Sequence, residues 1–457
     1  MGQITETIVE FALGDALAQP PSAALATAAD GFTDAVGVML AAVAEPLTDN
    51  LRRHVDAQGG RSVSRVMLSE SRATVSQATL VGVGAAHALD FDDYAYSNHV
   101  SALLVPALLA EADRTPATGA ELLRAYLAGM ESWGAVMKRE PDHLHSKGWH
   151  PTGVFGPIGV AIAVGRLRKL SAAQLTYAIG LAACSGGGVM DNFGAQSKSY
   201  QGARAAEAGV TAVELALAGL DAGPHALDGS GGLLAALSPE GRVDLTGPID
   251  WLGRTWIAEK EKLNIKRHPT VGASQRAIDA ALQVQKDHQP ELAEIARVEA
   301  RISEKHAAVM RFHTPVDALQ AKFSLQFGVA AALINGRVGL AELRDEYVSR
   351  EDVQALLRKV ELVIGPDDDP TYPVGAVADS IAVTLRDGRV IESEPVRRFR
   401  GHGMNPMTRD ELAEKFVECV RPVLDNEAGS GLFEQLQNLN DLQSVNELPV
   451  IDLPGLA

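Results

Sequence analysis

The chain has 457 residues, 46% of them hydrophobic and 22% charged, which is ordinary for a globular protein. Its formal net charge of −17 argues against a nucleic-acid binder, because such proteins carry a basic surface. The two cysteines, Cys184 and Cys419, are too few for a disulfide framework and predict a reducing compartment. The N-terminus lacks the basic start of a signal peptide, and the longest apolar stretch, 153–165, is too short to cross a bilayer. We therefore predict a cytoplasmic protein that binds neither membranes nor nucleic acid.

The chain up to about residue 260 has the residue pattern of helices. Segment 209–220 is apolar almost all round, which predicts a helix buried in a multi-helix core. Three helix starts carry a capping box, in which a Ser or Thr is followed three residues later by Glu or Gln. They lie at 118–121, 171–174 and 408–411.

The pattern changes between about 270 and 400, where apolar and polar residues alternate as in strands. Strands are predicted at 296–303, at 359–365 and twice within 379–396, where Asp387-Gly388 forms a hairpin turn. Helices are predicted at 272–287, 317–335 and 408–424. We predict a mainly α protein, a large all-helical domain with an inserted, smaller α+β lid domain. The predicted parts are the helical domain at 1–268, the lid at 269–403 and helices returning to the helical domain at 404–457.

An acidic cluster, Asp90, Asp92 and Asp93, stands shortly before His99 in an otherwise apolar stretch. Buried carboxylates are costly unless they are paired, so each of them needs a partner. Three partners are open: a metal, a cationic substrate, or lysines and histidines of the chain itself. Helix capping is the alternative structural role for Asp92 and Asp93.

Three histidines lie together in segment 139–156. His143 and His145 could hold zinc, but no third ligand stands at the usual spacing, so a surface loop is the simpler interpretation. His150 directly precedes a proline and a small, apolar helix, a position that suits a side chain directed into a cleft. It is either functional or a hydrogen-bonded histidine of the core.

Two basic clusters follow, Lys198 with Arg204, and Lys266 with Arg267 and His268. The first lies among small residues, and the second stands where the helical and α+β patterns meet. Together they predict a cationic pocket for a carboxylate substrate. The sequence has no nucleotide-binding fingerprint, and no G-x-S-x-G motif precedes a histidine as in hydrolases.

Six motifs resemble those of the MmgE/PrpD family, and they follow one another in the family's order over nearly the whole chain. The family includes 2-methylcitrate dehydratases, cis-aconitate decarboxylases and iminodisuccinate epimerases. The resemblance implies a helical domain with an α+β lid, a homodimer, and a site at the domain junction that uses no metal or cofactor. The matching segments are 87–101, 148–152, 193–206, 266–275, 321–327 and 405–416.

Carried over by position, the family's catalytic residues are Asp90, His99, His150, Lys198 and Lys266. We predict that seven neighbours bind the substrate: Asp93, Tyr94, Gln201, Arg204, Arg267, His268 and Gln275. The chain departs from the family motifs at several positions, where two histidines and one tyrosine are missing. These departures are Tyr94, Val100, Ser199, Gln201, Val271, Gln275 and Phe327.

The chemistry that the resemblance implies is proton abstraction next to a carboxylate. Lys198 and Lys266 would hold the developing charge, and His150 or His99 would be the base, with Asp90 orienting an imidazole. Three functions are open: a lyase (dehydratase or decarboxylase) acting on a small carboxylic or polycarboxylic acid, an isomerase or epimerase of a similar acid, and a non-catalytic protein on the same scaffold.

Overall fold

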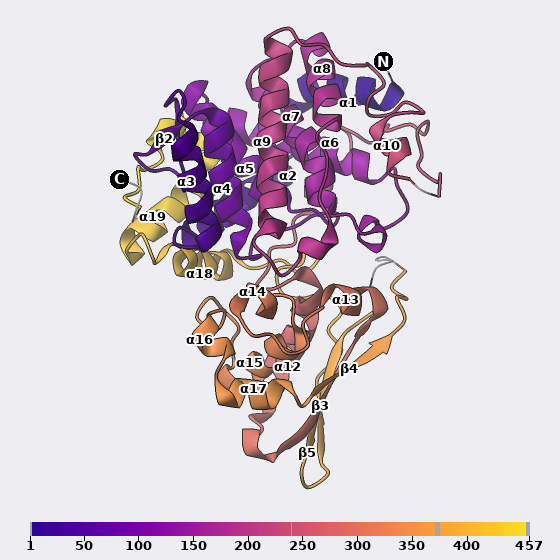
Figure 1. Ribbon diagram of the computed structural model, residues 1–457, viewed down its shortest axis with the longest axis vertical. Coiled ribbons are helices and arrows are strands. Elements are labelled where there is room, and N and C mark those ends of the chain that lie inside the picture. Colours follow the sequence, from indigo (N-terminus) through magenta and orange to yellow (C-terminus); the bar gives the residue numbers. More distant parts are fainter. Residues whose placement is uncertain (1, 239, 371–374, 454–457) are drawn as a thin grey trace. The chain divides into compact units, whose positions relative to one another are not determined.

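The computed structural model describes residues 2–238, 240–370 and 375–453. The chain forms two compact units, which are described separately (Figure 1). The helical unit comprises Met1–Asn192, Ser197–Leu263 and Thr408–Ala457, and the α+β unit comprises Phe193–Gln196 and Asn264–Met407. The prediction of a mainly α protein is confirmed. The predicted domain boundaries and the role of a lid stay predictions.

In the helical unit, the N- and C-terminal parts of the chain pack together. Helices α18 and α19, near the C-terminus, pack against α2. Figure 1 shows these yellow helices beside the indigo helices of the N-terminal part. The helices are α1 (Gln3–Leu13), α2 (Ser22–Ala41), α3 (Pro46–Gln58), α4 (Val75–Ala88), α5 (Val100–Arg114), α6 (Gly119–Met137), α7 (Pro151–Leu167), α8 (Ala172–Ala183), α9 (Ser197–Leu217), α10 (Leu233–Ala236), α11 (Ile257–Lys260), α18 (Arg409–Val420) and α19 (Asn426–Gln437). Two very short strands, β1 (Ser64–Arg65) and β2 (Arg72–Ala73), were missed by the helical prediction because two residues carry no periodicity.

Helix α7 is the centre of this unit, and all of its residues except Arg166 are buried. It packs against α5, α6, α8 and α9. Its glycines permit this close approach: a Cβ on Gly159 would lie 2.4 Å from the Trp133 ring of α6. The helix therefore holds its N-terminal residue, Pro151, in a fixed place, and His150 directly precedes it.

The predicted capping boxes are confirmed: Thr118, Ser171 and Thr408 each accept a hydrogen bond from the backbone N–H three residues later. The prediction that segment 209–220 is buried all round is wrong in part. Only its part up to Leu217 belongs to α9, where Leu215 is exposed, and Leu220 is exposed beyond the end of the helix.

Helix α2 is long and apolar enough to cross a membrane by length and composition, which the sequence analysis did not recognise. Of its apolar window, 78% is buried within the structure. It packs against α4, α5, α6 and α18, as a core helix does.

The α+β unit is built on a four-stranded sheet in the order β4-β3-β5-β6. Strands β3 and β4 are parallel, and the other two pairs are antiparallel. The strands are β3 (Ile295–Ser303), β4 (Val360–Gly365), β5 (Ser380–Leu385) and β6 (Val390–Glu392), close to the predicted ranges. The helices are α12 (Gln275–His288), α13 (Glu304–Val309), α14 (Ala318–Ala321), α15 (Leu325–Asn335), α16 (Asp345–Val348) and α17 (Glu351–Leu357).

Alternation along β3 decides which face of this sheet is covered. Val298, Ala300 and Ile302 are buried with residues of α12 and α15, whereas Arg297 and Arg301 are exposed. The predicted helix 317–335 is divided into α14 and α15, because Ser324 caps a new helix by accepting from the Phe327 N–H.

Candidate active site

Three segments of the helical unit bring polar side chains together. They are the loop from α4 to α5 (residues 89–99), the residues before α7, and the first turn of α9. Near the start of this loop, Asp90 is in the left-handed region (φ +51°), which turns the chain sharply after α4. The backbone N–H of His99 donates to Thr152 Oγ1 at 3.1 Å and so ties the loop to α7.

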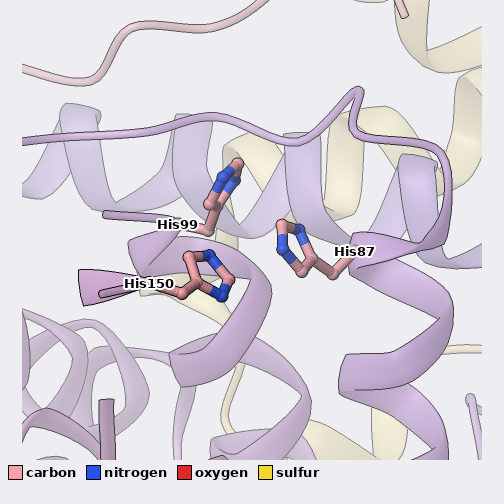
Figure 2. A group of neighbouring side chains, drawn as sticks. All are labelled: His87, His99 and His150. Atoms are coloured by element: carbon pink, nitrogen blue, oxygen red, sulfur yellow. The ribbon is translucent and has the colours of Figure 1, made fainter. Parts of the chain in front are cut away.

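Asp92 contacts two histidines, His87 of α4 and His99. Figure 2 shows these two imidazoles beside that of His150. The Asp92 oxygens are 3.2 Å from His87 Nδ1 and 2.7 Å from His99 Nδ1. Burial raises the pKa of Asp92, but the two imidazoles outweigh burial and hold this pKa well below its ordinary value. Because an ionised carboxylate only accepts hydrogen bonds, both Nδ1 atoms are donors. With Nδ1 directed at Asp92, the Nε2 of His99 is the nitrogen that can exchange a proton with a substrate.

Lys198 of α9 contacts this nitrogen. Its Nζ lies 3.3 Å from His99 Nε2 and 2.9 Å from an Asp90 oxygen. The Lys198 side chain is only 4% exposed and the Asp90 side chain 3%. The sequence analysis expected Lys198 to serve the substrate alone, whereas this buried ion pair also gives the lysine a structural role. It also assigned the orienting carboxylate to Asp90, whereas Asp92 holds the His99 ring and Asp90 pairs with the lysine.

His150 precedes α7, and its ring centroid lies 6.2 Å from that of His99 (Figure 2). The Gln201 Oε1 accepts from Val189 N–H and from Asn192 Nδ2, both at 2.7 Å, which turns its amide nitrogen toward His150 Nδ1 at 3.1 Å. The Nδ1 of His150 is therefore an acceptor and its Nε2 carries the proton. Burial, followed by the charge of Lys198, holds the pKa of His150 well below its ordinary value, so this imidazole is neutral.

Gly188 completes the surroundings of His150. Its φ is +136°, in the region that favours glycine, and its carbonyl accepts from the His150 N–H at 3.0 Å. A Cβ here would lie 3.2 Å from Gln201 Cδ. A side chain at this position would therefore press on the amide that orients the imidazole.

Asp93 is buried and contacts another part of the helical unit. Its N–H donates to Asp34 of α2 at 2.8 Å, and Asp34 forms a close ion pair with Lys415 of α18 at 2.5 Å. Lys415 also donates to the Phe91 carbonyl at 2.9 Å. Burial and the nearby Asp34 raise the pKa of Asp93 well above its ordinary value. Asp93 is fully buried, and its contact with Asp34 positions the loop. Its role in substrate binding stays a prediction.

Two other predicted substrate-binding residues of this unit differ in exposure. Tyr94 is partly buried in the loop before α5. Arg204 is exposed on α9 and pairs with Glu207 at 3.1 Å, one helical turn away.

The remaining predicted residues lie in the α+β unit. Lys266 is buried and Arg267 is exposed. His268 is buried between the Val338 carbonyl and Asp279, and Gln275 donates to the His268 and Thr270 carbonyls. Both side chains are thus engaged within the unit, and the Gln275 contacts hold the turn directly after Lys266.

The sequence analysis missed three residues near the site. His87 and Asp92 were not selected, although both stand in the first family motif, and no sequence signal separates Asp92 from Asp93. His145 was assigned to a surface loop. Its ring stacks on His143 at 4.7 Å, and burial, His143 and Lys198 lower its pKa to about 3.

Two groups of described residues hold metal-type ligand atoms within 4.8 Å of one another: His87, His99 and His150, and His87, Asp90, Asp92 and His99. The Lys198 ammonium donates to Asp90 and His99, which belong to these groups. A bound cation would meet this like charge at short range, so the arrangement does not fit a resident metal while Lys198 is charged.

The fold and the site agree with the family that the sequence motifs resemble. The helical unit holds a cluster of Lys198, His99 and Asp92, and the chain also forms an α+β unit. The MmgE/PrpD N-terminal domain matches residues 6–246 and the MmgE/PrpD C-terminal domain matches residues 268–439. The chain belongs to the MmgE/PrpD family. It is 28% identical over 389 residues to the cis-aconitate decarboxylase of Homo sapiens, covering 82% of this chain and 78% of that protein.

Similar relatives occur in fungi. The cis-aconitate decarboxylase-like protein oryM of Aspergillus oryzae is 28% identical over 386 residues, covering 79% of each chain. The cis-aconitate decarboxylase of Aspergillus terreus is 24% identical over 387 residues, covering 79% of this chain and 78% of that protein.

Proposed function

We propose that this protein is a lyase that acts on a small polycarboxylic acid, with decarboxylation of cis-aconitate as the first reaction to test. The names of three relatives support the substrate. The observation that carries the proposal is the chain of contacts from Asp92 through His99 to Lys198, because it places a basic nitrogen beside a cation in a buried site. Such a pair serves a reaction in which a proton moves while negative charge develops next to a carboxylate.

In this proposal His99 is the proton-transfer group. Asp92 fixes its tautomer and stabilises its imidazolium form, as a carboxylate does in a catalytic triad. When the C–CO₂⁻ bond breaks and CO₂ leaves, this imidazolium supplies the proton that the resulting carbanion takes up. His150 has a different role, because Gln201 leaves its Nε2–H as a donor and its low pKa keeps it neutral. It would donate a hydrogen bond to a substrate oxygen and would not act as the base.

Lys198 supplies the positive charge that stabilises the developing anion, and we propose that Lys266 supplies a second one. We further propose that the α+β unit serves as a lid and that closure brings Lys266 to the substrate. Replacement of Lys266 by methionine tests this role: turnover should fall on the order of a hundredfold. Unchanged turnover would remove Lys266 from the proposal.

The reaction is proposed to need no metal. Lys198 donates to two of the groups that would otherwise bind a cation, and His99 with Asp92 supplies proton transfer without one. Activity should therefore persist after exhaustive chelation with EDTA. Loss of activity that returns only with a divalent ion would contradict this part of the proposal.

The deciding experiment incubates the enzyme with cis-aconitate in D₂O and follows products by NMR. Release of CO₂ with one deuteron placed on the product supports the lyase. Deuterium exchange with no net loss of CO₂ or water indicates an isomerase instead, for which His99 and His150 could be the two proton-transfer groups. His99→Gln should lower turnover by a hundredfold or more. His150→Gln should slow turnover, but the product should still carry the deuteron. The opposite pattern would exchange the two roles.

A further inference from the structure

A cavity of about 340 Å³ lies in the helical unit, at the C-terminal end of α7. It is lined by Leu13, Glu121, Arg124, Arg166, Leu167, Lys169 and Leu170. His150 directly precedes the opposite end of α7, and 17 helical residues span about 25 Å. The cavity is therefore separate from the histidine cluster.

The charges of this cavity are unbalanced. Lys169 pairs with Glu121, the one carboxylate among the lining residues, at 3.3 Å. The lining therefore offers no second carboxylate to the guanidinium groups of Arg124 and Arg166. Neither forms an ion pair with any carboxylate in the part of the chain that the structure describes, while three leucines form the apolar wall. Burial, followed by the positive charge of Arg124, lowers the pKa of Arg166, so the two cations oppose one another. Partly buried like charges are unfavourable unless an anion lies between them.

Of these two arginines, only Arg166 makes a hydrogen bond within the described residues that accounts for its position. Arg166 donates to the carbonyl of Ala12, in the last turn of α1, where a cation stabilises the helix end. No comparable hydrogen bond holds Arg124 among the described residues. Arg124 therefore repels Arg166, and no hydrogen bond or ion pair among the described residues offsets this repulsion in the unliganded protein.

We propose that this cavity binds a small polycarboxylate, as a site distinct from the candidate active site. A guanidinium group binds a carboxylate through two parallel hydrogen bonds, and two such groups from different helices suit two carboxylates of one molecule. The volume admits a small metabolite and exceeds the need of a single inorganic ion. A cationic pocket of this kind is unexpected on a chain with a net charge of −17.

The experiment is calorimetric titration of citrate, at fixed ionic strength, into the wild type and two variants. Arg124→Gln removes one cation from the cavity. Arg168→Gln is the matched control, because Arg168 is near in sequence but pairs with Glu111 at 3.2 Å and is not among the lining residues. Any citrate bound at the candidate active site contributes equally in all three proteins.

Arg124→Gln should weaken citrate binding at the cavity at least tenfold, while Arg168→Gln binds as the wild type does. Without citrate, Arg124→Gln should melt no lower than the wild type, because it relieves repulsion. Arg124→Lys, which keeps the charge without the paired donors, should bind with intermediate affinity. Three results would overturn the proposal: equal citrate binding in Arg124→Gln, a lower melting temperature of this variant without citrate, or equally tight binding of inorganic phosphate, which would indicate an unselective anion patch.

Discussion

The pairing of Lys198 with Asp90 makes this lysine both a reactive and a structural residue. Lys198→Met removes the cation and leaves the Asp90 carboxylate buried without it. We expect turnover to fall on the order of a hundredfold and the free energy of unfolding to fall by about 3 kcal/mol, as for other broken buried pairs. Enzyme assays and urea denaturation measure the two effects.

A double variant separates these two roles of Lys198. Lys198→Met combined with Asp90→Asn leaves no buried charge at the pair, so most of the lost stability should return while activity stays low. If activity returned together with stability, the cation would have no part in the chemistry.

The neutral histidines of the cluster make stability depend on pH. The pKa of His150 in the folded chain is lowered well below 6.5. As pH falls below about 6.5, His150 is therefore protonated in the unfolded chain and stays neutral in the folded chain. The His150 contribution is therefore fully present above this pH and is lost below it, with a slope of up to about 1.4 kcal/mol per pH unit. His150→Gln should unfold with a shallower pH dependence between pH 6.5 and 4 in urea titrations. An unchanged slope would mean that His150 is already charged in the folded state.

Among the elements, α18 stabilises the acidic loop from the other end of the chain. Lys415 pairs with Asp34 of α2 and donates to the Phe91 carbonyl, directly between Asp90 and Asp92. Lys415→Met should lower the free energy of unfolding by about 3 kcal/mol, because it leaves a buried carboxylate unpaired. Adding Asp34→Asn to Lys415→Met should restore part of the lost free energy of unfolding. Urea unfolding of the single and double variants measures this coupling, and additive effects of the two changes would contradict it.

For the whole molecule, we expect a homodimer. Family resemblance is the main ground, and α9 adds an exposed face with Tyr200 and Leu215 that could pack against another copy. Light scattering at micromolar protein should give a mass near twice the 48.2 kDa of one chain. A mass near 48.2 kDa across that concentration range would contradict this expectation.

Much of the secondary structure was predictable because its signals are local. Alternation along 296–303, the Asp387-Gly388 turn and the capping residue Thr118 each act within a few residues, and all three agree with the structure. The family motifs likewise indicated Asp90, His99, His150 and Lys198, which the structure brings together. Short strands such as β1 were missed because two residues carry no periodicity.

The roles within the cluster depended on tertiary contacts. Asp92 and Asp93 are neighbours in sequence, yet Asp92 is ionised between His87 and His99, and burial beside Asp34 raises the pKa of Asp93. No local pattern distinguishes two adjacent carboxylates, because their ionisation depends on which distant charges pack against each. In the same way, Gln201 decides which nitrogen of His150 carries the proton, through contacts made only when α9 lies beside the start of α7. Sequence alone therefore determined the family and the kinds of residue in the site, and packing decided the ionisation of Asp92 and of His150.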